Sequence, residues 1–367
     1  MRTGIITFHR TTNYGAALQA YALQKKLTDM EVQTEIIDYR NMNIYSYYDT
    51  CFFKDLALKT RIGKVLRYPY NKAVYDKFAA FWEKWMNLSQ VCATLEELRQ
   101  VEQAYDAVIC GSDQVWNPRA IFKDFEAFLL GTAECKKIAY AASAGNVSLW
   151  EPYLKTYWKL LHRFDAISVR EQDMQLPTEH LSQKDVEVVF DPTLLLEQHD
   201  WCELEESAVL EQLPSNGYIL VYFLGKNPAV VQAVHELQEK TGLPIVSLGR
   251  KINGVKAFRP IAGPSEFLAL FHHASYVLTS SFHGTVFSIQ YQTPFLVFGN
   301  GVYNSRMNTL LETLGLQARM ISSEADSVIE KMNREIHWEQ VQLCYAQEKQ
   351  HSLAFLQKAL NKKGEEF

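Results

Sequence analysis

The sequence has few of the features that mark a secreted or membrane-embedded protein. Its six cysteines are scattered through 367 residues, and no two of them form a C-x-x-C pair. Neither a disulfide framework nor a clustered zinc motif is therefore predicted. No uninterrupted apolar stretch approaches the ~20 residues that cross a bilayer. The first residues enter a strand-like run at once, without the apolar region and cleavage site of a signal peptide. We expect a cytoplasmic protein with no transmembrane segment.

A surplus of positive charge is also absent. Lysine and arginine total 37 against 42 aspartates and glutamates, a formal net charge of −5, so we predict no nucleic-acid partner. No G-x-G-x-x-G motif follows the first predicted strand, and no G-x-x-x-x-G-K-[ST] motif occurs. The sequence thus lacks a dinucleotide fingerprint and a P-loop. Because no His, Asp and Glu residues show metal-ligand spacing, we expect no metal and no cofactor.

What the sequence does contain is an alternation of short apolar runs and longer helical patterns. Unalternating runs rich in Val, Ile, Tyr and Phe are typical of parallel strands buried on both faces. Residues 14–27 and 227–240 place apolar side chains at the i, i+3, i+4 spacing of a helix. This order predicts an α/β, doubly wound architecture. The predicted strands are Gly4–Phe8, Glu35–Tyr39, Ala107–Cys110, Ile138–Ala142, Ala166–Val169, Val186–Phe190, Tyr218–Leu224, Pro244–Leu248, Tyr276–Thr279 and Pro294–Phe298.

The length suits two domains of ~150 residues or more. The two series of strands separate near Asp191-Pro192-Thr193, so we predict an N-terminal domain at 1–195 and a C-terminal domain at 196–367, the latter with a helical tail. A segment at about 40–100 is helical in pattern and rich in aromatic residues. We interpret it as an insertion packing its own small core, or as a lid or platform on which sugar rings stack. Its aromatic residues are Tyr45, Tyr47, Tyr48, Phe52, Phe53, Phe78, Phe81, Trp82 and Trp85.

Ligands of open α/β sheets bind beyond the carboxyl ends of the strands, so the residues that follow each run are site candidates. After the first run come Arg10, Asn13 and Gly15, at the predicted start of a helix. They could bind an anion or a polyol with the unpaired N–H groups of the helix start. Alternatively, Asn13 caps the helix and the glycine allows close packing.

Two further runs end in polar residues. Ser112 and Asp113 follow the run at 107–110, where they could cap a turn or face a carbohydrate. Arg170 follows the run at 166–169 directly. An arginine there needs an anionic partner, and a ligand carboxylate or phosphate would match its planar fork. A structural carboxylate is the alternative.

The most informative segment links a predicted strand to an apolar helical run. His283 would lie at the carboxyl edge of the sheet, beside a helix N-terminus whose positive end favours bound anions and a neutral imidazole. Such a histidine could act as a base, and the neighbouring Gly284 could let the backbone approach a ligand. The segment reads Ser280, Ser281, Phe282, His283, Gly284 and Thr285.

These motifs, in this order, resemble the polysaccharide pyruvyl transferase family over roughly residues 4–315. The resemblance rests on Asn13-Tyr14-Gly15 with the helix that follows, Gly111 to Asn117, Val169-Arg170-Glu171, Asp191-Pro192-Thr193 and Ser280 to Thr285. It implies two Rossmann-like domains in a glycosyltransferase-B-like arrangement, with the active site in the cleft between them. It also implies transfer of pyruvate from phosphoenolpyruvate to two hydroxyls of a sugar, with formation of a cyclic ketal and release of phosphate.

One position departs from the family pattern. Members with studied chemistry carry an arginine two residues before the histidine, whereas this chain has Ser281 there. Arg170, at a position that resembles a donor-contacting arginine of the family, and Arg10 are the nearest replacements. Arg306 is a further candidate.

The resemblance therefore predicts a transferase that acts on a surface polysaccharide or its lipid-linked precursor, with peripheral contact to lipid-linked acceptors. His283 would be the general acid/base, Arg170 and the start of the helix after it would hold phosphoenolpyruvate, and Asn13 and Asp113 would hold the sugar. Two alternatives stay open. The first is a nucleotide-sugar glycosyltransferase of the same fold, and the second is a non-catalytic module that binds sugars or anions.

Overall fold

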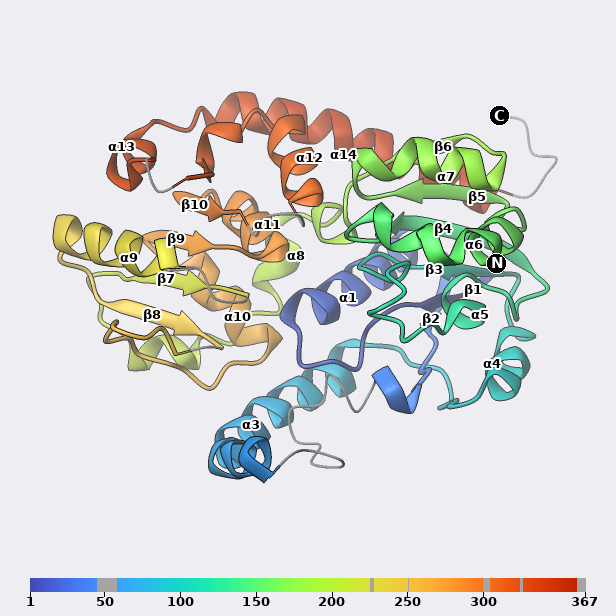
Figure 1. Cartoon of the computed structure of the whole chain (residues 1–367), viewed down its shortest axis with the longest axis horizontal. Coiled ribbons are helices and arrows are strands. Elements are labelled where there is room, and N and C mark those ends of the chain that lie inside the picture. Colours follow the sequence, from blue (N-terminus) through green and yellow to red (C-terminus); the bar gives the residue numbers. More distant parts are fainter. Residues whose placement is uncertain (45–57, 225–227, 250, 300–303, 324–325, 362–367) are drawn as a thin grey trace. The chain divides into compact units, whose positions relative to one another are not determined.

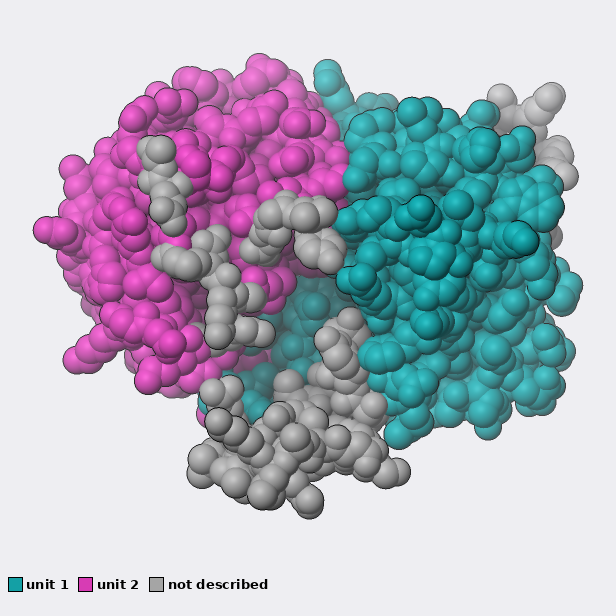
Figure 2. All heavy atoms as spheres, in the orientation of Figure 1, with its two compact units in different colours: residues 1–195, 347–367 teal, residues 196–346 magenta. Residues whose placement is uncertain are grey.

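The computed structural model describes residues 1–44, 58–224, 228–249, 251–299, 304–323 and 326–361. The chain divides into two compact units, which Figure 2 shows in different colours. Unit 1 comprises residues 1–195 and 347–367, and unit 2 comprises residues 196–346. Among the described residues, no helix combines the length and the apolar character needed to cross a membrane.

A parallel sheet of six described strands forms the centre of unit 1, in the order β2-β1-β3-β4-β5-β6 (Figure 1). Every side chain of β3 is buried, as expected for a strand covered on both faces. Because β1 lies between β2 and β3, the winding direction of the sheet reverses between β1 and β3. The strands are β1 (Arg2–Ile6), β2 (Gln33–Ile36), β3 (Ala107–Cys110), β4 (Lys136–Ala142), β5 (Ala166–Val169) and β6 (Val186–Val188).

The helices of unit 1 follow from local signals as well as from packing. Asn13 caps the first of them, since its Oδ1 accepts hydrogen bonds from the N–H groups of Gly15 and Ala16 at 3.0 and 3.4 Å. Thr94 and Glu97 form a capping box at another. These helices are α1 (Tyr14–Asp29), α3 (Leu58–Trp85), α4 (Leu95–Glu102), α5 (Phe125–Phe128), α6 (Leu154–Leu161) and α7 (Gln175–Ser182).

Unit 2 contains a second parallel sheet, in the order β11-β10-β9-β7-β8. Here the winding direction reverses between β7 and β9. Its strands are β7 (Ile219–Tyr222), β8 (Ile245–Leu248), β9 (Tyr276–Thr279), β10 (Phe295–Phe298) and β11 (Met320–Ile321). Its helices are α8 (Gln198–Cys202), α9 (Pro228–Thr241), α10 (Pro264–His272), α11 (Phe282–Gln290), α12 (Ser305–Thr313) and α13 (Val328–Asn333).

The predicted doubly wound α/β architecture is confirmed, and each predicted apolar run overlaps a strand. The bounds of β3, β5 and β9 agree with the prediction residue for residue. The strand that the sequence analysis missed, β11, has only two residues, too few to produce a recognisable apolar run.

The described part of the aromatic insertion packs on the first helix. Within the described residues, the ring of Phe78 lies 5.2 Å from that of Tyr14, and the ring of Phe81 lies 6.1 Å from that of Tyr21. Phe78 and Phe81 are buried, as is Trp82. These residues of α3 therefore cover α1. Tyr45, Tyr47, Tyr48, Phe52 and Phe53, on which a lid or platform would also depend, lie outside the described residues.

The last helix, α14 (Trp338–Leu360), begins in unit 2 and ends in unit 1. Its second half packs on the first sheet, where the Phe190 N–H donates to Ser352 Oγ at 2.9 Å and the Tyr140 ring lies 6.2 Å from that of Phe355. Residues 347–367 thus group with unit 1, whereas the sequence analysis assigned all of 196–367 to one domain. The hydrophobic pattern of α14 showed that it packs, and could not show on which sheet.

Candidate functional site

The switch point of unit 1, between β1 and β3, carries two of the candidate residues. Asn13 and Asp113 line a small polar pocket of about 80 Å³ with Thr11 and Gln114. Thr11 is buried, and its hydroxyl makes no hydrogen bond to any other described residue. The volume corresponds to roughly three water molecules at ~30 Å³ each. A hydroxyl-bearing group of a ligand fits there, and a whole sugar ring does not.

The backbone of Asp113 is held in an unusual conformation. Its φ is 75°, in the left-handed region that non-glycine residues rarely adopt. The N–H groups of Val115 and Ser143 donate to its carbonyl at 2.7 and 3.1 Å, and its own carboxylate accepts from the Gln114 N–H at 2.8 Å. The turn thereby aims the Asp113 side chain at the pocket.

Behind this turn lies a buried ion-pair network centred on Arg170, whose side chain is 1% exposed. Its Nη1 donates to Asp191 Oδ2 at 2.7 Å and to Ser112 Oγ at 3.4 Å. The carboxylates of Asp113 and Glu171 lie 3.7 and 3.9 Å from the guanidinium. Burial lowers the pKa of Arg170, but Asp191, Asp113 and Glu171 outweigh it and raise this pKa above its usual value. Arg170 thus pairs with structural carboxylates, the alternative that its sequence position had left open.

The remaining oxygens of the network are also hydrogen-bonded. Asp191 Oδ1 accepts from the N–H and the hydroxyl of Thr193 at 3.0 and 2.6 Å. Glu171 Oε1 accepts from Ser143 Oγ at 2.7 Å and from the Gly145 N–H at 3.2 Å. The network therefore ties together the loops that follow β3, β4, β5 and β6.

A second charged cluster lies where β1 and β2 end. Asp38 is 2% exposed and accepts hydrogen bonds from Arg40 at 2.7 and 3.0 Å and from Arg10 at 3.2 Å. The ring nitrogens of His9 face Asp38 and the Thr7 carbonyl at 3.1 and 3.2 Å. Burial opposes ionisation of Asp38, but these partners hold its pKa well below its usual range.

This cluster has a surplus of positive charge, because two arginines face one carboxylate. The side chains of Arg10 and Arg40 keep 24% and 35% of their surface exposed. The Arg10 guanidinium also lies over the Trp82 ring, 5.2 Å from its centroid. A carboxylate or phosphate could bind here through charge-assisted hydrogen bonds. Arg10 was a sequence candidate. His9, Asp38 and Arg40 were missed, although Asp38-Tyr39-Arg40 lies one residue beyond the end of β2.

The switch point of unit 2, between β7 and β9, carries the His-Gly segment. Ser281 caps α11, with its hydroxyl accepting from the Gly284 N–H at 3.4 Å. The Thr285 hydroxyl donates to the Ser281 carbonyl at 3.2 Å, and the Leu224 N–H donates to Ser280 Oγ at 3.0 Å. Ser280, Ser281 and Thr285 are all buried. They build the turn between strand and helix.

Gly284 is required by packing. A Cβ at this position would lie 2.3 Å from Thr279 Oγ1 and 3.2 Å from the Tyr222 ring. The glycine therefore lets α11 approach β9 and β7, whereas the sequence analysis expected it to admit a ligand.

His283 occupies the first turn of α11, as predicted, and is 7% exposed. The Phe282 ring meets its imidazole edge-on, with centroids 5.2 Å apart. Arg306 lies half-buried in the first turn of α12, next to Met307, whose sulfur accepts from the Thr285 hydroxyl at 3.1 Å.

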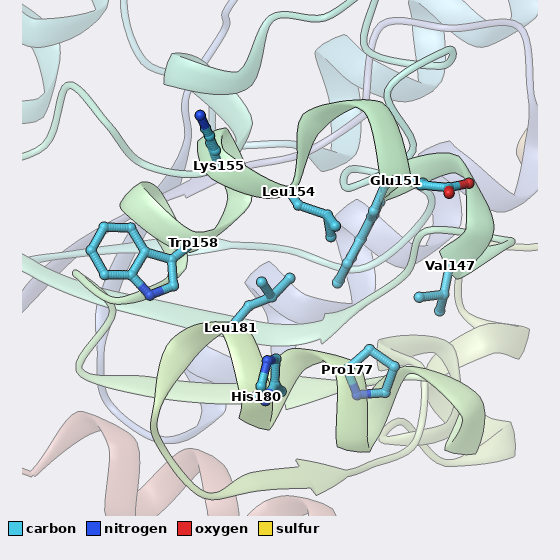
Figure 3. A pocket seen from close by; sticks show the side chains of 9 residues that line it. Val147, Glu151, Leu154, Lys155, Trp158, Pro177, His180 and Leu181 are labelled. Carbon is cyan, nitrogen blue, oxygen red and sulfur yellow. The ribbon is translucent and has the colours of Figure 1, made fainter.

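A larger groove, of about 510 Å³, lies elsewhere in unit 1. Figure 3 shows Leu154 and Val147 on one side of it, and Pro177 and His180 on the other. Its surface is apolar, and no candidate from the sequence analysis lines it.

Comparison with known proteins decides the family. The family model described as polysaccharide pyruvyl transferase matches residues 13–301. The chain belongs to this family. The matched span contains all of the sequence candidates except Arg10 and Arg306. No curated protein matches the sequence significantly.

Solved structures confirm the predicted fold class of two Rossmann-like domains of the glycosyltransferase-B type. The UDP-GlcNAc 2-epimerase of Methanocaldococcus jannaschii aligns with a TM-score of 0.57 and 12% identity, covering 98% of this chain and 100% of that one. The UDP-N-acetylglucosamine 2-epimerase of Rickettsia bellii aligns with a TM-score of 0.56 and 12% identity, covering 97% of this chain and 96% of that one. The Neisseria meningitidis epimerase, solved with bound UDP-GlcNAc, aligns with a TM-score of 0.53 and 10% identity, covering 99% of this chain and 95% of that one. At such identities the likeness concerns the fold alone.

The network predicts that Arg170→Met is strongly destabilising, because it leaves three buried carboxylates without their counter-charge. We expect a loss of about 3–5 kcal/mol in the free energy of unfolding, the usual cost of removing one partner of a buried ion pair. Chemical denaturation measures it. Arg99→Met is the control, since Arg99 pairs with Glu96 at the surface and should change stability by less than about 1 kcal/mol. Equal effects of the two substitutions would contradict the network.

The second cluster predicts a pH-dependent effect of Asp38→Asn. At neutral pH we expect a loss of about 1.5–3 kcal/mol, the range for hydrogen bonds to a charged group. The pKa of Asp38 is lower in the folded than in the unfolded state, so this stabilisation is present above about pH 4 and declines as the pH falls further. Wild type and variant should therefore converge in acid, whereas a difference that is constant with pH would refute the assignment. Asp29→Asn, at the surface, is the control.

Proposed function

We propose that this protein transfers pyruvate from phosphoenolpyruvate to two hydroxyls of a sugar, in a surface polysaccharide or its lipid-linked precursor. Membership of the family supports this reaction. The observation that carries it is the chemistry at the switch point of unit 1. There a polar pocket suited to hydroxyls lies between the loops after β1 and β3. A cationic cluster suited to an anion lies where β1 and the adjacent strand β2 end.

The atom balance of the reaction defines what the site must do. One sugar hydroxyl adds to C2 of phosphoenolpyruvate while C3 gains a proton and becomes a methyl group. The second hydroxyl then adds to C2, and the bond from C2 to the phosphate oxygen breaks. The two hydroxyl protons end on C3 and on the phosphate, so no oxidant, reductant or further co-substrate is needed. The site must hold two anionic groups, bind two hydroxyls and move two protons.

We assign the anionic groups of the donor to Arg40 and Arg10, because these guanidinium groups carry the surplus positive charge and are partly exposed. Arg170 is buried among three carboxylates, and we therefore assign it the positioning of Asp113. The Asp113 carboxylate would accept hydrogen bonds from the sugar hydroxyls, and Thr11 and Asn13 could donate to them or accept from them. We propose that general acid/base catalysis carries the reaction without a metal or cofactor.

In unit 2, we assign His283 the role of general acid/base. It lies in the first turn of α11, beyond the carboxyl end of β9 at the switch point. The neighbouring residues fix the position of the His283 ring, because Ser281 caps α11 and Gly284 allows α11 to pack closely on the sheet.

A nucleotide-sugar glycosyltransferase is the second candidate. The epimerases of similar fold are named for UDP-GlcNAc, and one was solved bound to it. Such an enzyme would hold the nucleotide diphosphate where we place the anionic donor.

Calorimetric titration with phosphoenolpyruvate and with UDP distinguishes the two. We expect phosphoenolpyruvate to bind, and Arg40→Ala to weaken it about 10- to 150-fold, which corresponds to losing a charged hydrogen bond of ~1.5–3 kcal/mol. Arg99→Ala, at the surface of unit 1, should leave binding unchanged. Tight UDP binding without phosphoenolpyruvate binding would overturn the proposal in favour of the second candidate.

His283→Ala should lower turnover at least ~100-fold, the low end for loss of a general acid/base, with an unchanged melting temperature. Phosphate release from phosphoenolpyruvate, measured with a panel of free and lipid-linked oligosaccharides, follows the reaction. His235→Ala, on the exposed surface of α9, is the matched control. Near-normal turnover of His283→Ala at saturating donor would rule out this role.

A further inference from the structure

A second group of reactive side chains lies in unit 2, away from the His-Gly segment. Cys202 ends α8, Glu205 follows it by three residues, and His272 ends α10. Since α10 leads into β9, His272 lies near the amino end of that strand, whereas His283 follows its carboxyl end. The two histidines therefore belong to opposite edges of the same sheet, and the group is independent of the proposed function.

One ligand atom from each of these three residues lies within 4.8 Å of the other two. His272 Nδ1 faces Glu205 Oε1 at 2.9 Å and Cys202 Sγ at 3.9 Å. The side chains of Glu205 and His272 are 10% and 29% exposed. The three atoms therefore converge in a half-buried position that an ion can reach from solvent.

Tyr291, at the end of α11, closes the group from a third helix. Its ring stacks on that of His272, with centroids 4.5 Å apart and planes 13° apart. It is 8% exposed, and its hydroxyl has no well-aligned hydrogen bond among the described residues. The Tyr291 ring therefore covers His272 from one side, and its hydroxyl lies near Glu205.

The donor set points to the identity of the cation. Thiolate, imidazole and carboxylate together are the ligands of Zn²⁺, whereas Mg²⁺ and Ca²⁺ take oxygen ligands. Zinc bond lengths of about 2.0–2.3 Å in a tetrahedron place neighbouring ligand atoms roughly 3.2–3.6 Å apart. The observed 2.9 and 3.9 Å differ from this range by a few tenths of an ångström. The atoms of Cys202 and Glu205 lie within 4.8 Å of each other, so we expect metal binding to draw the three side chains together.

We propose that Cys202, Glu205 and His272 form a zinc site that joins α8, the loop after it and α10. His273, whose Nε2 lies 3.9 Å from Glu205 Oε2, or a water molecule completes the tetrahedron. The ion replaces the proton of the Cys202 thiol, and the Tyr291 hydroxyl donates to the bound carboxylate. The site stabilises unit 2 at the edge opposite His283.

Binding is tested with the full chain, first freed of metal by dialysis against a chelator. Zinc titrated in competition with a chromophoric chelator should bind at one equivalent and raise the melting temperature. Cobalt in its place should produce the near-ultraviolet absorption of a sulfur-to-cobalt bond. Cys202→Ser should abolish that absorption, and His272→Gln should weaken zinc binding at least tenfold.

Cys135→Ser, a half-exposed cysteine of unit 1, is the matched control and should change neither result. Zinc binding that is equally tight in Cys202→Ser and wild type, a cobalt complex without the sulfur absorption, or no stoichiometric binding would each overturn the proposal. Because the readouts are metal affinity, absorption and melting temperature, the outcome does not depend on the transferase activity.

Discussion

The buried guanidinium of Arg170 is the interaction on which the architecture of unit 1 depends most. A buried charge is unfavourable unless it is paired and hydrogen-bonded, and here Asp191, Asp113 and Glu171 satisfy it from three different loops. These loops lie at the carboxyl edge of the sheet, where a ligand site needs rigid walls. The left-handed backbone of Asp113 is maintained because hydrogen bonds and the ion pair hold it from both sides.

Charge is distributed unevenly along this edge. Around Arg170 three carboxylates face one guanidinium, whereas around Asp38 two guanidinium groups face one carboxylate. An anionic donor is favoured at the second cluster and repelled at the first. Hydroxyl groups, which can donate to a carboxylate, are favoured beside Asp113. One sheet edge thus offers places of different chemistry, which is what the proposed transfer would need for a donor and an acceptor.

In unit 2 a single helix links two edges of the sheet. The first turn of α11 holds His283 at the switch point, and Tyr291 follows its last turn beside His272. Gly284 allows the helix to lie directly on Thr279 and Tyr222, so its position is set by close packing. A cation bound at Cys202, Glu205 and His272 would fix the far end of the same helix through Tyr291.

The sequence by itself determined the features that arise from local patterns. Apolar runs identified the strands, and Asn13 indicated the start of α1. The motifs, taken in their order, identified the family. Partners distant in the chain were decided only by the tertiary structure. Arg170 could have met a ligand or a carboxylate, and residues 21 and 58 positions away settled its environment. Cys202 and His272 are separated by 70 positions and approach because α8 and α10 pack together. The physical reason is that backbone periodicity and capping act within a few residues, whereas the environment of a buried charge or thiol is set by whichever segments the fold brings around it.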